Sequence, residues 1–81
     1  MFPVLGERLR TLRAEHSGWT QTSVAEAVGV KQPTYAAWEA GAKFPSSADH
    51  LRALCRLYNV SSDYLLGLID ERRPWPPQQS T

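Results

Sequence analysis

The chain has 81 residues, a formal net charge of +1 and a single cysteine, Cys55. This length predicts one domain, near the lower size limit at which a hydrophobic core is stable without disulfides or metal ions. A single cysteine excludes an internal disulfide. Cysteine and two isolated histidines match no zinc spacing, so we expect no metal and no cofactor. The near-neutral charge argues against coating of nucleic acid by bulk attraction, so DNA binding would depend on locally placed basic residues.

No membrane segment is expected. The start, Met1 to Val4, lacks the charged flank and apolar stretch of a signal peptide, and no apolar run is long enough to cross a bilayer. We therefore expect a cytoplasmic protein without a membrane partner. Basic residues cluster within 8–13 and at 72–73, and Lys31 and Lys43 lie near the middle of the chain. This distribution fits either solvated faces or contacts with phosphate.

The first predicted element is an amphipathic helix over residues 5–16, because leucines recur there at helical spacing with arginines between them. Ser17 and Gly18 are expected to end it. A shorter helix is predicted over residues 21–28, with Thr20 as its N-cap because a threonine oxygen accepts from a free N–H of the first turn.

Gly29 is predicted to end this second helix, since the turn needs a positive φ that glycine adopts without strain. A third helix follows Val30 and runs to Ala40. Pro33 lies in its first turn, where the missing N–H would have had no intrahelical partner, and Gly41 ends the helix.

Two more helices are expected, over 48–58 with Ser46 or Ser47 as cap and over 62–69 after Ser61. No strand pattern or internal repeat is found. The chain is therefore predicted to be all-α, with five helices.

The predicted helical domain spans residues 1–69. Residues 70–81 are rich in proline and lack periodicity, which predicts an extended or disordered tail. Trp75 in this tail has three open interpretations: an anchor on its own domain, an anchor on a partner, or a solvent-exposed side chain.

Residues 20–41 carry the functional signal. They read TQTSVAEAVGVKQPTYAAWEAG and closely resemble the Cro and lambda-repressor-like, or XRE, family, whose typical pattern is TQxxLAxxxGVSQxTISxWExG. The resemblance extends over roughly residues 5–67. It implies a five-helix domain of a bacterial or phage protein whose second and third helices form a helix-turn-helix. Such domains usually bind double-stranded DNA as a dimer on a palindromic operator, with the third helix in the major groove.

The resemblance and elementary chemistry together predict the DNA contacts. Gln21 begins the second helix, where free N–H groups and the helix dipole favour a phosphate, and Gln32 begins the third, where an amide can pair with adenine. By resemblance these two glutamines contact phosphate and base respectively, and they often brace each other. The full predicted set is Thr20, Gln21, Thr22, Lys31, Gln32, Pro33, Thr34, Ala36, Ala37 and Lys43.

Few base-facing positions carry hydrogen-bonding groups. Of the five that the resemblance implies, only Gln32 and Thr34 have polar side chains, so the protein either relies on DNA shape or has modest specificity. Lys31 replaces the serine or threonine cap of the family, which predicts a weaker helix start and a positive charge near the DNA. Lys43 is the expected phosphate ligand of the following loop.

An ion pair and a dimer contact are also implied. Arg13 and Glu39 occupy positions that form a partly buried ion pair in relatives, and two solvated charges are the alternative. The dimer contact is expected on the fifth helix, since so short a helix would leave apolar surface uncovered. Its predicted residues are Tyr64, Leu65, Leu68 and Ile69, together with part of the tail.

The remaining conspicuous residues are interpreted as structural. Cys55 is expected to be a small buried hydrophobe, and His16 and His50 have no acid or cysteine arranged for metal or triad chemistry. The sequence therefore predicts no enzyme and no small-molecule ligand. We predict a sequence-specific transcriptional repressor. The alternative is a protein-interaction module of the same fold, such as an antitoxin or polymerase-binding regulator, with secondary DNA binding. Core positions are expected at Trp19, Tyr35, Trp38, Leu51, Leu54 and Leu57.

Overall fold

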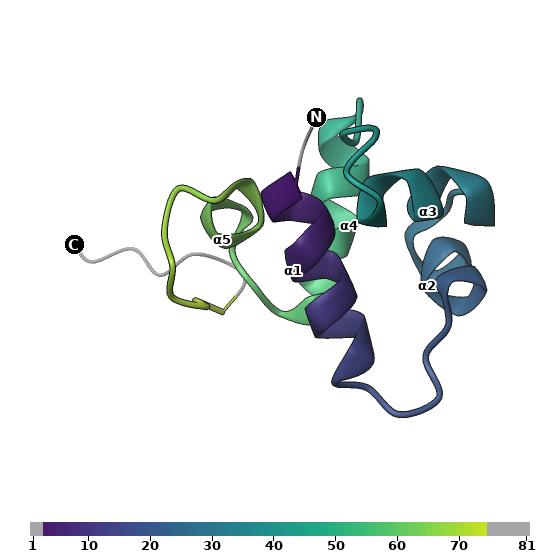
Figure 1. Ribbon diagram of the computed structural model, residues 1–81, viewed down its shortest axis with the longest axis horizontal. Helices are drawn as coiled ribbons and strands as arrows, with labels where there is room; N and C mark the ends of the chain where they lie inside the picture. The colour runs from purple at the N-terminus through teal and green to yellow at the C-terminus, as the bar shows by residue number, and fades with distance from the viewer. Residues whose placement is uncertain (1–2, 75–81) are drawn as a thin grey trace.

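The computed structural model describes residues 3–74, and within this range it contains five α-helices and no strand. The predicted all-α fold is therefore confirmed. The helices are α1 (Pro3–Ala14), α2 (Gln21–Val28), α3 (Gln32–Glu39), α4 (Ala48–Tyr58) and α5 (Ser62–Leu66) (Figure 1). Helix α1 packs against both α3 and α5, and α4 packs against both α2 and α5. No helix in the described part of the chain is long and apolar enough to span a bilayer.

Two helix boundaries differ from the sequence expectation. Helix α1 begins at Pro3 and ends at Ala14, two residues earlier at each end than predicted, because proline suits a first helical turn. Helix α5 ends at Leu66, before the predicted residue 69. Gly67 there adopts φ 83° and its N–H bonds back to α5, so this glycine ends the helix as Gly29 ends α2.

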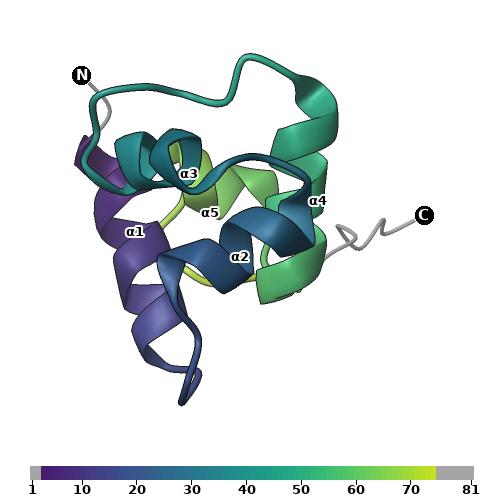
Figure 2. The same cartoon turned by 90° about the vertical axis from the view of Figure 1, so that its right-hand side faces the viewer.

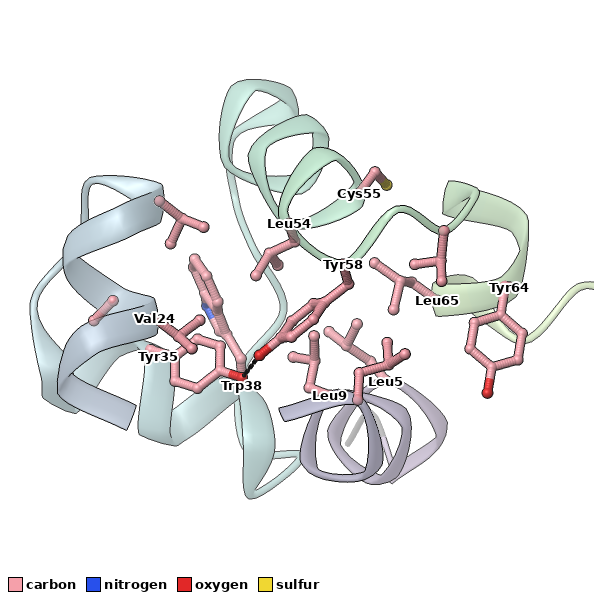
Figure 3. Packing of buried hydrophobic residues seen from close by; sticks show 14 residues of the cluster. Leu5, Leu9, Val24, Tyr35, Trp38, Leu54, Cys55, Tyr58, Tyr64 and Leu65 are labelled. Atoms are coloured by element: carbon pink, nitrogen blue, oxygen red, sulfur yellow. Dashed lines mark hydrogen bonds between the residues drawn. The ribbon is translucent and has the colours of Figure 1, made fainter. Parts of the chain in front are cut away.

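The core lies where all five helices meet (Figure 3). Tyr35 and Tyr58 bury their rings in it and join their hydroxyl oxygens at 2.8 Å, so the polar atom of each ring has a partner. Cys55 is buried as expected, and burial raises the pKa of its thiol to about 11. The buried apolar residues are Leu5, Leu9, Leu12, Val24, Ala25, Val28, Tyr35, Trp38, Leu54, Cys55, Tyr58, Val60, Tyr64 and Leu65.

Residues 70–74 bond to the residue that follows α1 and to the N-cap of α5. The Arg72 guanidinium donates to Oε1 of Glu15 at 2.7 Å, and the backbone N–H of Ser61 donates to the Arg73 carbonyl at 2.7 Å. The predicted division between domain and tail remains a prediction. Trp75 and the rest of the predicted tail lie outside the described residues.

Candidate nucleic-acid interface

Helices α2 and α3 are joined by a tight turn that local sequence determines. Thr20 caps α2 by accepting from the Ser23 N–H at 3.0 Å, while Ser23 Oγ accepts from the Thr20 N–H at 2.9 Å. At the other end Gly29 has φ 83°, and the Val30 N–H bonds back to the Ala25 carbonyl at 2.9 Å. These bonds end α2 and let α3 begin three residues after Gly29. Figure 2 shows the two helices crossing the face turned to the viewer.

Helix α3 buries one face and exposes the other. Tyr35, Trp38 and Glu39 are buried, whereas Pro33 and Thr34 are exposed and Gln32, Ala36 and Ala37 are partly exposed. The positions predicted to face bases therefore lie together at the surface of α3.

The flanking predicted contacts are also accessible. Lys31 precedes α3, makes no side-chain cap bond and is exposed, as is Lys43 in the following loop. Thr20 and Thr22 are exposed at the start of α2, with the Thr20 oxygen engaged in the cap. The structure thus brings polar and basic side chains to both borders of the exposed α3 face.

The C-terminal end of α3 is held on α1 by the ion pair that the sequence led us to expect. Arg13 Nε donates to Glu39 Oε2 at 2.7 Å, and a second guanidinium nitrogen donates to Oε1 at 3.0 Å. Only 2% of Glu39 is exposed. Burial raises the pKa of its carboxyl, but hydrogen bonds from Arg13, Tyr35 and Gln21 outweigh this and hold the pKa below its ordinary value.

A chain of hydrogen bonds continues from this carboxylate to the start of α3. Gln21 Nε2 donates to Glu39 Oε1 at 3.1 Å, and Gln32 Nε2 donates to Gln21 Oε1 at 2.8 Å. The two glutamines brace each other, as the resemblance implied. The link from Gln21 to Glu39 was not predicted, because nothing in a linear pattern indicates that residues 18 apart will meet.

Two further α1 residues hold α3 and were missed by the sequence interpretation. Arg10 donates to the backbone carbonyl of Glu39. At Gly6 a Cβ would overlap that same carbonyl oxygen and lie 3.0 Å from the Gly41 nitrogen, so α1 and the end of α3 meet backbone to backbone. The available signal was a glycine inside an amphipathic helix, which usually marks close packing.

The predicted dimer residues fall into two groups. Leu65 and Tyr64 belong to the core of their own chain, and the Arg8 guanidinium lies 4.2 Å from the centre of the Tyr64 ring. Ile69 is partly buried, whereas Leu68 is 71% exposed.

Two exposed apolar side chains were not predicted there, Val4 at 43% and Leu66 at 41%. A Cβ at Gly67 would lie 2.9 Å from Val4 Cγ1, so Val4 adjoins the end of α5. We call Val4, Leu66 and Leu68 the α1–α5 patch.

Comparison with known proteins identifies relatives of the chain. A family model described as a helix-turn-helix domain matches residues 4–66. The chain is 44% identical over 68 residues to the "uncharacterized HTH-type transcriptional regulator YobD" of Bacillus subtilis (strain 168), across 84% of this chain and 59% of that protein. It is 40% identical over 63 residues to the HTH-type transcriptional regulator ImmR of the same organism, across 78% and 48%. The chain thus spans only about half the length of these curated relatives.

A solved structure shares the architecture. The solution structure of the SOS-response transcriptional repressor LexA from Eubacterium rectale superimposes with a TM-score of 0.71, covering 96% of this chain and 76% of that chain. The two sequences are 20% identical, so the likeness concerns the fold alone.

Proposed function

We propose a regulatory function from the premise that this chain belongs to the XRE-type helix-turn-helix family, the family that residues 20–41 resemble. In this proposal it is a sequence-specific DNA-binding transcription regulator. It acts as a repressor by occupying a palindromic operator as a homodimer. The observation that carries the proposal is the exposed face of α3, which presents Gln32 already fixed by Gln21.

Helix α3 is the element proposed to enter the major groove. Its buried face is occupied by the core, so only the side with Gln32, Pro33 and Thr34 is free to approach base edges. The start of α2 then crosses the phosphate backbone, where Gln21 and the free N–H groups of the first turn donate to phosphate oxygens.

Base readout is proposed to depend mainly on Gln32. A glutamine amide pairs bidentately with adenine, a contact that contributes about 1–3 kcal/mol of discrimination. Pro33, Thr34 and Ala37 are exposed or partly exposed on the same helix and are proposed to contact thymine methyl groups, which discriminate less. Operator specificity is therefore expected to be concentrated at one base pair in each half-site.

The homodimer is proposed to form through the α1–α5 patch together with Ile69. The patch is apolar and exposed, and a two-fold axis through it would bury the same residues from both copies. Tyr64 and Leu65, which the sequence predicts in this contact, are buried within their own chain, so Val4 and Leu66 take their place in the proposal.

Selection from random duplexes at fixed salt tests the DNA-binding proposal. The wild type is expected to enrich a palindrome with half-sites about one DNA turn apart. Gln32→Ala and Gln21→Ala are expected to weaken binding to it. If no motif is enriched and neither substitution changes binding, the proposal fails.

A protein-interaction module is the second candidate function. The net charge of +1 and the alanines at 36 and 37 favour it, because both limit what α3 gains from DNA. Salt titration separates the two candidates. A DNA binder that neutralises several phosphates loses affinity steeply as salt rises, whereas flat salt dependence favours the interaction module.

A further inference from the structure

The hydrogen bonds between Glu39, Gln21 and Gln32 all point the same way, with each donor directed toward the carboxylate. We propose that Glu39 fixes the polarity of this chain and thereby makes Gln32 selective for adenine over guanine. The inference rests on the proposed function, in which Gln32 reads a base. It assigns a specificity-determining role to a buried residue that does not itself reach the DNA.

The direction of the hydrogen bonds is set by the Glu39 carboxylate, whose two oxygens can only accept. Glu39 is ionised, because Arg13 pairs with it and its pKa lies below the ordinary value. An ionised carboxylate has acceptors and no donor. Any amide that bonds to it must present an N–H, and Gln21 does so through Nε2 at 3.1 Å. The opposite orientation would place two oxygen acceptors against each other.

The orientation of Gln21 in turn fixes that of Gln32. Because one N–H of Gln21 Nε2 donates to Glu39, Gln21 presents its oxygen to Gln32. An amide oxygen accepts only, so Gln32 must donate through Nε2, as it does at 2.8 Å. One of the two N–H bonds of Gln32 is thereby used inside the protein.

What remains on Gln32 is one N–H and one oxygen. In the major groove adenine offers an acceptor at N7 and a donor at N6, which this remaining pair complements. Guanine offers acceptors at both N7 and O6, and a glutamine would need two free N–H bonds to satisfy both. The second donor of Gln32 is already engaged by Gln21, so guanine leaves the Gln32 oxygen opposite an acceptor.

A merely structural role for the chain predicts a different result. If Glu39 and Gln21 only held α2 against α3, breaking the chain would weaken binding to all duplexes by a similar factor. If they set polarity, breaking it changes the ratio of affinities for adenine and guanine at one base pair. The ratio is therefore the decisive readout.

The test uses the full chain and two duplexes of a selected operator that differ only in adenine or guanine at the base pair read by Gln32. That base pair is the one at which Gln32→Ala loses discrimination. The wild type is expected to prefer adenine roughly 5- to 150-fold, the ratio that a good bidentate pair supplies. Replacing adenine by 7-deazaadenine is expected to weaken wild-type binding, because it removes the N7 acceptor.

Gln21→Leu interrupts the chain while leaving the ion pair of Arg13 and Glu39 intact, and it is expected to lower the adenine preference at least threefold. Glu39→Gln lets both amides turn over and is expected to lower it likewise. Thr22→Ala is the matched control. Thr22 is exposed beside Gln21 and outside the chain, so this substitution should change both affinities by the same factor.

The outcomes distinguish a failure of the polarity proposal from a failure of the proposed function. If Gln21→Leu and Glu39→Gln keep the wild-type ratio, the polarity proposal is overturned while base reading by Gln32 stands. If Gln32→Ala alters discrimination at no base pair, the proposed function is what fails. Thermal unfolding establishes that Glu39→Gln is folded at the assay temperature, and if it is not, the ratio for Gln21→Leu decides.

Discussion

The two faces of α1 hold their partners in different ways. Toward α3, Arg13 reaches a carboxylate that is almost fully buried, and Arg10 bonds a backbone carbonyl of the same residue, Glu39. Toward α5, Arg8 donates to the Ile69 carbonyl at 2.8 Å, but its carboxylate partner, Asp70, is fully exposed. The difference lies in the partner carboxylates, since Arg8 and Arg13 are themselves both largely covered. We call the α3 side, where the carboxylate is buried, the shielded face, and the α5 side, where it is exposed, the solvated face.

The two faces therefore differ in how firmly they hold the helix that packs on them. A buried pair is hardly screened by salt and fixes the direction of its side chains, whereas exposed pairs contribute little and weaken as salt rises. The proposed base readout requires donors and acceptors held at defined positions, and the contacts of the shielded face hold α3 in this way. The apolar α1–α5 patch, where we propose the dimer contact, adjoins the solvated face.

The largest effect is expected from removing the arginine of the shielded face. Arg13→Ala leaves the Glu39 carboxylate buried without its cation, and we expect it to lower the free energy of unfolding by about 3 kcal/mol. Urea denaturation measures the change. A loss no greater than that of Arg8→Ala would contradict the contrast between the two faces.

Gly6→Ala is expected to have the next largest effect. Its Cβ would meet the backbone of α3 at Glu39 and Gly41, which cannot move aside as a flexible side chain does. We expect the steric overlap to lower the free energy of unfolding by about 1–3 kcal/mol. The higher helix propensity of alanine returns about 1 kcal/mol of this. Glu7→Ala, one residue along on the exposed side of α1, is the control. If Gly6→Ala is as stable as this control, the close approach is wrong.

A smaller effect is expected from acid. The folded protein holds the pKa of Glu39 below its ordinary value of 4.5. A carboxyl whose folded pKa is lowered contributes stability that is complete above its unfolded pKa and is lost as pH falls through the folded value. Stability should therefore decline below about pH 4.5, and Glu39→Gln should decline less because it cannot titrate.

Urea midpoints at pH 7 and pH 3 measure this dependence. Glu15→Gln is the control, since the pKa of Glu15 is also lowered, by its hydrogen bond from Arg72, but at an exposed site. The control should keep most of the wild-type acid sensitivity. Equal sensitivity in Glu39→Gln and the wild type would contradict the account.

The smallest effect is expected at the solvated face. Arg72→Ala removes the ion pair with Glu15, in which both side chains are substantially exposed. The unfolding midpoint should shift less than for Arg13→Ala or Gly6→Ala, and the shift should shrink further in high salt because exposed charges are screened. A shift comparable to that of Arg13→Ala would show that the two faces do not differ in this way.

Features set by neighbouring residues were predictable from the sequence. Thr20 and Gly29 define the ends of α2 through contacts a few residues away, and the bounds of α4 were predicted to the residue. The end of α5 was placed too late because the apolar pattern continues through Leu68 and Ile69. Gly67 nevertheless turns the chain there into a left-handed conformation.

Features that depend on packing were harder to predict. The sequence predicts Leu65 in a dimer contact because a short isolated helix would expose it, but in the folded chain the other helices cover it completely. The bond between Gln21 and Glu39 likewise exists only once α2 and α3 are packed. The DNA-facing residues that the family pattern implies stay a prediction, whereas the connection of Gln21 and Gln32 through a buried carboxylate is seen only in the structure.

Nuclear magnetic resonance of the labelled protein, titrated with its selected operator, shows whether DNA is bound through α3. The account predicts that the side-chain amide resonances of Gln32 and Gln21 shift at saturation, together with the backbone amides of Lys31 and Thr34. Resonances of Cys55 in α4 should change little. Shifts confined to α4 and α5, with both glutamine amides unmoved, would contradict binding through α3.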